Sequence, residues 1–228
     1  MANRRVLVCA AHPDDEALGC GGTMARHGQW GDEVHVMFLA DGVASRSGDG
    51  RDVDAELDER RAAANAAATI LGANAPIFVA YPDQRLDAIP LLDVTQSIER
   101  VMGELKPDIV YTHHAGDLNG DHRIVAQAVL TASRPFPGQP VAAIYGFEVL
   151  SSTEWAFGAQ EAFRPSRFVS ISGTLPQKLR ALEAYRAEMR DYPHPRSLEA
   201  VEALARYRGA TVGEQAAEAF TVFRECVR

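Results

Sequence analysis

A short apolar run near the start of the chain ends abruptly in a polar stretch, and this junction constrains the fold more than any other feature. Residues 6–10 read Val-Leu-Val-Cys-Ala, and residues 11–16 read Ala-His-Pro-Asp-Asp-Glu. A continuous apolar run of this length is typical of a strand buried on both faces of a parallel sheet. Open α/β sheets bind ligands at the carboxyl ends of such strands. We therefore expect chemistry at this edge.

The polar stretch contains residue types that hold divalent metals. His12 offers an imidazole, and Asp15 offers a carboxylate three residues later. Asp14 stands between them with a side chain that must point elsewhere, so it would be free to take a proton from a water on the metal. The alternative is a plain helix start, in which one of the two aspartates is the N-cap and Pro13 belongs to the extended lead-in.

Apolar runs alternate with helix-forming segments along the rest of the chain. The pattern predicts strands over residues 33–40, 76–81, 109–112, 141–149 and 167–171, helices over residues 16–27, 55–71, 91–105, 122–133, 178–189 and 198–207, and a strand or a helix over residues 217–226. This order indicates a three-layer α/β fold with a mostly parallel sheet. With 46% apolar residues, the chain suits one large core, so we expect a single domain over residues 1–228.

Three glycines lie inside the first predicted helix, at Gly19, Gly21 and Gly22. Glycine is costly within a helix, and such positions usually mark a close approach of the backbone to another element. The spacing also resembles the first half of a dinucleotide-binding fingerprint, but the next required glycine would fall on Met24. The dinucleotide interpretation is therefore weakened.

A second polar stretch follows the predicted strand at 109–112. Residues 113–123 read His-His-Ala-Gly-Asp-Leu-Asn-Gly-Asp-His-Arg, and they hold three of the seven histidines beside two aspartates. Chance seldom places so many potential ligands together. Because the carboxyl ends of parallel strands meet at one edge of a sheet, this stretch is expected near the first.

His122 would open a helix and complete a metal triad with His12 and Asp15. Three protein ligands leave one position open for water, as catalytic zinc sites require. The alternative for His122 is a polar residue at a helix start. For His113 and His114 it is a pair of satisfied polar groups at the end of a strand.

Other polar residues fall at or near the same edge. Asp41 and Asp83 each follow a predicted strand, where a carboxylate is either a turn residue or a group that contacts substrate. Arg60 lies in the predicted helix at 55–71, where its alternative is a solvated charged face. The glycine-containing loop from Asp41 to about residue 52 is either a mobile lid or a plain connection.

The formal net charge of −8 provides no basic surface for nucleic acid and argues against an anionic membrane as a partner. No apolar segment approaches a membrane-spanning length, and His12 interrupts the first apolar run too early for a signal peptide. We therefore expect a cytoplasmic protein with a small-molecule substrate.

Three unpatterned cysteines suggest no disulfide framework. Whether the chain forms a homo-oligomer stays open, and the aromatic-containing segment 151–165 suits a site cover, a subunit contact or ordinary surface packing.

Residues 11–16 and residues 116–123, Gly-Asp-Leu-Asn-Gly-Asp-His-Arg, together resemble the LmbE or PIG-L family of deacetylases. The resemblance extends from about residue 6 to residue 155 in strand and helix order. It implies a Rossmann-like fold and metal-dependent hydrolysis of an N-acyl group, usually the acetyl group of a glucosamine-type sugar. An amidase acting on another small-molecule amide is the nearest alternative.

The resemblance also implies roles for individual residues. By position, His12, Asp15 and His122 would hold zinc, with Fe²⁺ or another divalent metal as an alternative, and Asp14 would be the general base. Two histidines and one carboxylate also form the ligand set of non-haem iron oxygenases, which leaves Asp14 without a function. A sugar-binding module with a structural metal is the alternative outside enzymes.

For substrate binding, the resemblance implies that Arg60 points at the substrate and that Asp83 contacts sugar hydroxyls. Family members often carry a histidine, which stabilises the oxyanion, three residues before the last ligand, and this chain has Asn119 there. An asparagine can donate a hydrogen bond, but it cannot donate a proton as an imidazolium does. His113 or His114 is therefore the predicted replacement.

Overall fold

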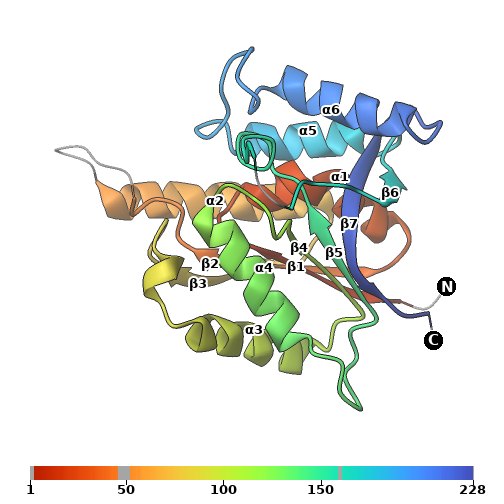
Figure 1. Ribbon diagram of the computed structural model, residues 1–228. Helices are drawn as coiled ribbons and strands as arrows, with labels where there is room; N and C mark the ends of the chain where they lie inside the picture. Colours follow the sequence, from red (N-terminus) through yellow and green to blue (C-terminus); the bar gives the residue numbers. More distant parts are fainter. Residues whose placement is uncertain (1–2, 46–51, 159–160, 228) are drawn as a thin grey trace.

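The structure is a computed structural model that describes residues 3–45, 52–158 and 161–227. Within these residues, one seven-stranded sheet carries helices on both of its faces (Figure 1). The predicted three-layer α/β fold with a mostly parallel sheet is confirmed. Residues 46–51 of the loop that was interpreted as either a mobile lid or a plain connection lie outside the described residues.

The strands form the middle layer in the order β3-β2-β1-β4-β5-β7-β6. Their bounds are β1 (Arg5–Ala10), β2 (Glu33–Ala40), β3 (Ile77–Tyr81), β4 (Ile109–His113), β5 (Ala143–Phe147), β6 (Arg167–Ser170) and β7 (Ala217–Glu225). The first five strands pair in parallel, whereas β7 is antiparallel to both β5 and β6.

The outer layers are helical. Their bounds are α1 (Asp15–Gln29), α2 (Val53–Leu71), α3 (Leu91–Leu105), α4 (Gly120–Ala132), α5 (Leu175–Ala184) and α6 (Leu198–Ala210), with a short 3₁₀ helix η1 (Leu86–Ala88). Figure 1 shows α3 and α4 on one side of the sheet, and α1, α2, α5 and α6 on the other. No helix among the described residues is long and apolar enough to cross a membrane.

Strand β1 is buried on both faces, which explains its unbroken apolar sequence. Val6 and Val8 belong to the core shared with α1, α2 and α5, whereas Leu7 and Cys9 belong to the core shared with α3 and α4. Successive side chains of a strand point to opposite faces of the sheet, so a strand between two helical layers must be apolar at every position. Cys9 is therefore a core residue, and its thiol is free.

The sheet order brings the two polar stretches of the sequence together. Strand β1 lies between β2 and β4, with Val6 opposite Ile109, so the chain leaves β1 and β4 side by side at the same edge. The connections from β1 and β4 run to opposite faces of the sheet, through α1 and α4. A crevice at such a switch point is where open α/β sheets bind ligands.

The helix predicted over residues 178–189 is displaced in the structure. Helix α5 begins at Leu175, with Pro176 in its first turn, and ends at Ala184. Proline is tolerated there because the first N–H groups of a helix have no partner within it. The segment predicted over residues 217–226 as a strand or a helix is the strand β7.

The glycines of α1 permit a close approach at two of the three predicted positions. A Cβ at Gly19 would collide with the Phe147 ring, and a Cβ at Gly22 would lie 2.8 Å from Ile171. At Gly21 the nearest atom would lie 3.5 Å away, which is an ordinary contact.

We therefore expect Gly19→Ala to lower the free energy of unfolding by about 1–3 kcal/mol through overpacking. Gly103 provides the matched control, because it lies inside α3 and a Cβ added there would meet no atom of another described element within 4 Å. There the same substitution should stabilise the protein by about 0.5–1 kcal/mol. Urea denaturation of both variants checks the pair, and equal effects would contradict this view of α1.

Candidate active site

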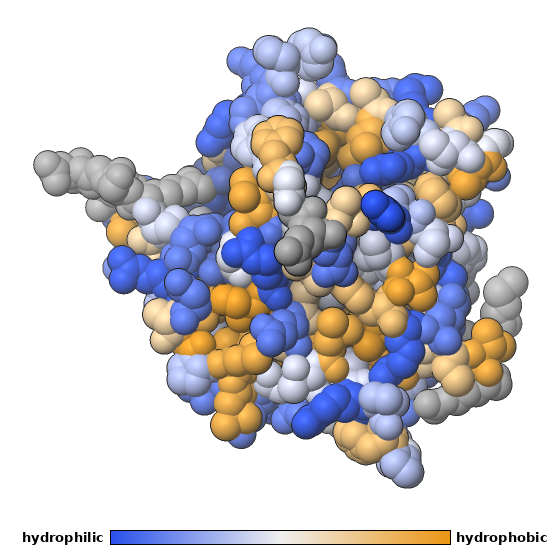
Figure 2. Space-filling view, in the orientation of Figure 1, coloured by the Kyte–Doolittle hydropathy of each residue, from blue (hydrophilic) through white to orange (hydrophobic). Residues whose placement is uncertain are grey.

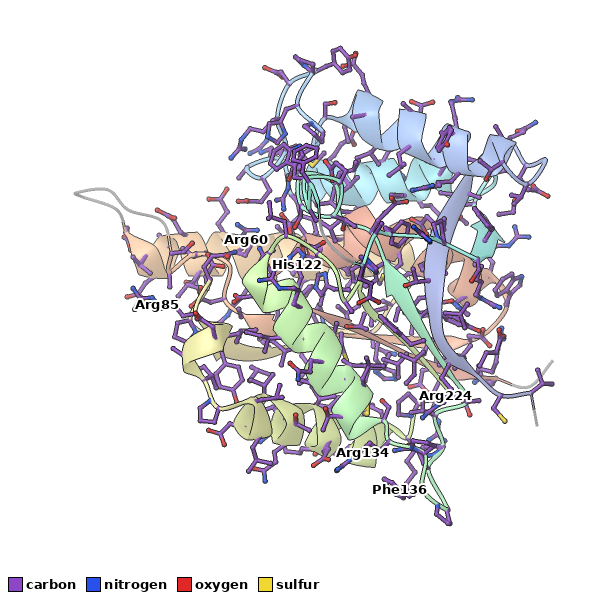
Figure 3. All side chains as sticks on the ribbon, viewed as in Figure 1. Arg60, Arg85, His122, Arg134, Phe136 and Arg224 are labelled. Carbon is purple, nitrogen blue, oxygen red and sulfur yellow. The ribbon has the colours of Figure 1, made fainter. Side chains whose placement is uncertain are left out.

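The three predicted ligands converge at the carboxyl edge of the sheet. His12 follows β1, Asp15 begins α1, and His122 lies in the first turn of α4. Asp15 Oδ2 is 3.2 Å from His12 Nδ1 and 3.2 Å from His122 Nε2. The three residues are buried, with exposed fractions of 7%, 0% and 1% respectively. Figure 3 shows His122 at the start of α4, far from the side chains labelled near that helix's other end.

The three side chains fit a divalent metal. Both ring nitrogens of His122 lie near carboxylates but lack the alignment of a hydrogen bond, and Asp15 Oδ1 has no hydrogen-bond partner among the described residues. Buried polar atoms rarely lack a hydrogen-bond partner, and a cation bound here would provide the missing interaction. Two imidazoles and one carboxylate suit four-coordinate zinc with one open position, and they also suit Fe²⁺.

The far side of the His12 ring faces two carboxylates. His12 Nε2 lies 2.9 Å from Asp83 Oδ1 and 3.1 Å from Asp121 Oδ2. These three residues also lie close enough to hold an ion. However, the two oxygens of Asp121 already accept hydrogen bonds from the backbone N–H groups of Gln84 and Leu86. We therefore interpret Asp83 and Asp121 as residues that orient the His12 ring through Nε2, and not as ligands of a second metal.

His122 has the same kind of support. Its Nδ1 lies 3.2 Å from Asp117 Oδ1, and Asp117 accepts hydrogen bonds from the hydroxyls of Ser152 and Thr153. Burial alone would raise the pKa of the Asp117 carboxyl, but these contacts outweigh burial and hold the pKa well below its usual value. An ionised Asp117 fixes the ring so that Nε2 faces Asp15.

Asp117→Asn should weaken zinc binding by about 10–100-fold, because the amide no longer offers His122 an anionic partner. Competition with a chromogenic chelator measures the change in zinc affinity. Asp58→Asn, at an exposed position of α2, is the control and should bind zinc as the unaltered protein does. Equal affinity of the two variants would show that Asp117 does not support the metal ligands.

Asp14 sits beside the triad in a strained backbone conformation. Its φ of 123° is one that residues with a side chain rarely adopt, and such strain gathers at functional sites. Asp14 Oδ2 lies 2.8 Å from Arg196 Nη1 and 3.6 Å from Arg60 Nη1. Burial raises the pKa of Asp14 to about 6, although Arg196 opposes the shift. A buried carboxylate that titrates near neutrality suits a general base.

Arg60 and Asp41 are occupied by the protein itself. Arg60 donates hydrogen bonds to the carbonyls of Pro13, at 2.7 Å, and Gly42, at 3.1 Å, and it forms an ion pair of 2.6 Å with Glu188. Asp41 Oδ1 accepts from two backbone N–H groups of the loop that follows it. These contacts favour a role in holding the loops around the site.

Of the two histidines at the end of β4, His113 contacts the triad, whereas His114 contacts the segment at Glu161. His113 Nε2 accepts a hydrogen bond of 2.8 Å from Ala11 N, and its ring stacks on His122 with the centroids 3.9 Å apart. Burial lowers the pKa of His113 well below its usual value, so this ring is neutral. His114 Nε2 lies 2.9 Å from the carbonyl oxygen of Glu161. These contacts favour packing roles for both rings.

Asn119 is the N-cap of α4. Its side-chain oxygen accepts a hydrogen bond of 2.9 Å from the backbone N–H of Asp121. An N-cap satisfies one of the N–H groups that a helix start leaves without a partner. Asn119 therefore fixes the first turn of α4, which contains His122.

Several residues of the site were not predicted from the sequence. They are Asp117, Asp121, Ser152, Thr153, Glu188 and Arg196. The two aspartates carry a usable signal, since a carboxylate near a ligand histidine often supports it. The other four lie in the second half of the chain, where no motif marks them.

Two cavities are lined by residues that contact the site, Asp121 in one and Arg60 in the other. One, of about 570 Å³, is lined by polar residues that include Gln84, Asp121 and Arg123 and by apolar residues that include Ile124 and Leu130. The other, of about 640 Å³, lies between α2 and α5 beside Arg60 and Glu188. Figure 2 shows hydrophilic residues over the start of α4 on this face of the molecule. Polar groups are therefore available around the site to bind a hydroxyl-rich molecule.

Comparisons with known proteins agree with this site. The family model described as PIG-L, GlcNAc-PI de-N-acetylase, matches residues 7–133, more than half of the chain. The uncharacterized deacetylase YaiS of Escherichia coli K12 is 29% identical over 194 residues, which cover 82% of this chain and 94% of YaiS. The Rhodococcus erythropolis 1D-myo-inositol 2-acetamido-2-deoxy-alpha-D-glucopyranoside deacetylase is 30% identical over 169 residues, which cover 60% of this chain and 58% of that protein.

A solved structure shares the whole fold. GalB, the 4-carboxy-2-hydroxymuconate hydratase from Pseudomonas putida, superposes with a TM-score of 0.79 at 23% identity and covers 99% of this chain and 98% of GalB. At that identity the likeness speaks for the fold and not for the reaction. The family match includes both polar stretches that form the site. The chain therefore belongs to the PIG-L family of deacetylases, enzymes that hydrolyse an amide carbon–nitrogen bond.

Proposed function

We propose that the protein hydrolyses the N-acetyl amide of a small molecule that contains an amino sugar, and that it uses zinc to do so. The observation that carries this proposal is the convergence of His12, Asp15 and His122 beside Asp14. The family description and the Rhodococcus relative, whose name specifies an acetamido sugar, support the substrate class. The cytoplasmic location and the homo-oligomer stay predictions.

When bound, zinc supplies a Lewis acid that polarises the amide carbonyl and acidifies water. His12, Asp15 and His122 would hold it, and Asp117 and Asp121 would orient the two imidazoles. Asp14 takes a proton from the attacking water and passes it to the amine that leaves, so that acetate and a free amine result. Burial of the site excludes bulk water and strengthens these interactions.

The cavity of about 570 Å³ that Asp121 helps to line is the proposed sugar subsite. Gln84, Asp87, Arg123 and Gln127 line it, and their donors and acceptors suit sugar hydroxyls. Asp83, which was predicted to contact those hydroxyls, lies between Ser45 and the His12 ring. In this proposal three residues do not contact the substrate but hold backbone segments around the site through hydrogen bonds. They are Arg60, Asp41 and Asn119.

A panel assay tests the proposal. The zinc-loaded protein is incubated with N-acetylated sugars, nucleotide-linked sugars and thiol-linked glycosides, and free amine and acetate are measured. We expect equal amounts of both products from one class. Sugar binding without acetate release would instead support a binding module, and oxygen-dependent turnover of the iron-loaded protein would support an oxygenase. Either result would overturn the proposed reaction.

A further inference from the structure

Arg196 reaches the site from the far end of the chain. It precedes Ser197, the N-cap of α6, and lies outside the matched family region. Arg196 Nη1 donates a hydrogen bond of 2.8 Å to Asp14 Oδ2, and Arg196 Nε donates one of 2.7 Å to Ser151 Oγ. The guanidinium therefore bridges the base candidate and the loop that follows β5.

The contacts of Asp14 leave one carboxylate oxygen for chemistry. Among the described residues, the ion-pair contacts from Arg196 and Arg60 both go to Oδ2. Oδ1 accepts no hydrogen bond from these residues. Fixing one oxygen of a carboxylate orients the other, and a general base works only when it is within reach of the proton that it takes. Arg196 thus determines where Oδ1 points.

Arg60 does not duplicate this contact. Its Nη1 is 3.6 Å from Asp14 Oδ2, beyond hydrogen-bond distance, and its guanidinium is paired with Glu188 at 2.6 Å. In contrast, Asp14 is the one carboxylate within ion-pair distance of Arg196 in the described part of the chain. The Arg196 charge is therefore directed at Asp14.

The bridge is anchored in strained backbone at both ends. Asp14 has a φ of 123° and Ser151 has a φ of 66°, and neither is a glycine. Such a conformation is costly for a residue with a side chain and persists only where its surroundings enforce it. Two such residues joined through one guanidinium indicate a built contact and not an incidental surface pair.

The loop that carries Arg196 is itself held in place. Arg196 N donates a hydrogen bond to His194 Nδ1, and Arg190 N donates one to the carbonyl of Arg196, both at 3.1 Å. The His194 ring meets Trp155 edge to face with the centroids 5.8 Å apart. The loop is therefore pre-organised, which lowers the entropy lost in fixing Asp14.

We propose that Arg196 is the positioning residue for the general base, supplied to the site by the second half of the chain. The inference deepens the proposed function and rests on it, since it assigns Asp14 the proton transfer. Ser151 supports this role of Arg196, because its hydroxyl oxygen accepts the hydrogen bond from Arg196 Nε and so sets the plane of the guanidinium.

Steady-state kinetics of zinc-loaded variants test the proposal. Arg196→Ala should lower kcat by about 10²-fold with little change in KM, because a misplaced base slows the chemical step without loosening the substrate. Added guanidinium should restore part of kcat, and Ser151→Ala should lower kcat by about 2- to 10-fold. Arg206→Ala, an exposed position of α6 paired with Glu202, is the matched control and should leave both constants unchanged.

Other outcomes would overturn the proposal. A raised KM with unchanged kcat would make Arg196 a substrate-binding residue, and a fall in kcat without guanidinium rescue would make it merely structural. If the unaltered protein releases no amine from any substrate, the proposed function fails. In that case the role of Arg196 can still be tested by the position of the Asp14 carboxylate. Crystal structures should show its carboxylate displaced in Arg196→Ala and retained in Arg206→Ala, and an unmoved carboxylate would refute the positioning role.

Discussion

Replacing Asp14 with asparagine is expected to lower kcat by about 10²–10⁴-fold while zinc remains bound. Asparagine has nearly the same shape and still offers an oxygen to Arg196, but it cannot accept a proton from water. The three proposed ligands are other residues, so their contacts with one another stay intact. Amine release by the zinc-loaded variant measures the effect, and metal analysis of the same sample establishes that the metal is present.

Asp54→Asn, at an exposed position near the start of α2, is the control for this substitution and should retain full activity. A thermal melt should place Asp14→Asn close to the unaltered protein or above it, because the buried carboxylate no longer has to be desolvated. Near-normal turnover of metal-replete Asp14→Asn would show that another group takes the proton. The roles assigned to Asp14 and to Arg196 would then both be wrong.

His122→Ala is expected to abolish both zinc binding and activity. The change removes one of three ligands and leaves the ionised carboxylates of Asp15 and Asp117 facing an empty space. Two protein ligands hold zinc poorly, since such sites use at least three. After dialysis against a weak chelator, the variant should retain almost no zinc by atomic emission.

His35→Ala tests whether the loss of a histidine matters in itself. His35 pairs with Glu33 near the start of β2, at the opposite end of that strand from the site, and its loss should leave zinc content unchanged. One equivalent of tightly held zinc in His122→Ala would mean that the metal is bound elsewhere. The second cluster around His12, with Asp83 and Asp121, would be the first place to look.

The sequence predicted the scaffold wherever its pattern was strong. The apolar run at 33–40 and the amphipathic segment at 91–105 coincide with β2 and α3, because burial on defined faces imposes these periods. The bounds of α5 differ from the prediction because the helix includes Pro176 in its first turn instead of starting after it. The predicted triad followed from ligand residue types at the carboxyl ends of two predicted parallel strands, which meet at one edge of a sheet, and from the family resemblance.

The rest of the site depends on loops, whose sequences lack the hydrophobic periodicity that predicts helices and strands. Arg196 and Ser152 reach Asp14 and Asp117 through irregular segments, and only their place in three dimensions reveals the contacts. Asn119 illustrates the converse. The resemblance suggested a hydrogen-bond donor for the oxyanion at this position, and the structure adds a role that the sequence did not reveal, since the side-chain oxygen of Asn119 caps α4.

Anomalous diffraction at the zinc absorption edge, from crystals grown with zinc, locates the metal relative to the three proposed ligands. We expect one strong peak at about 2.0–2.2 Å from His12 Nδ1, an Asp15 carboxylate oxygen and His122 Nε2. Asp14 should lie alongside with Oδ1 turned toward the open position. A peak among His12, Asp83 and Asp121, or no peak at the triad in active crystals, would show that His12, Asp15 and His122 do not hold the catalytic metal.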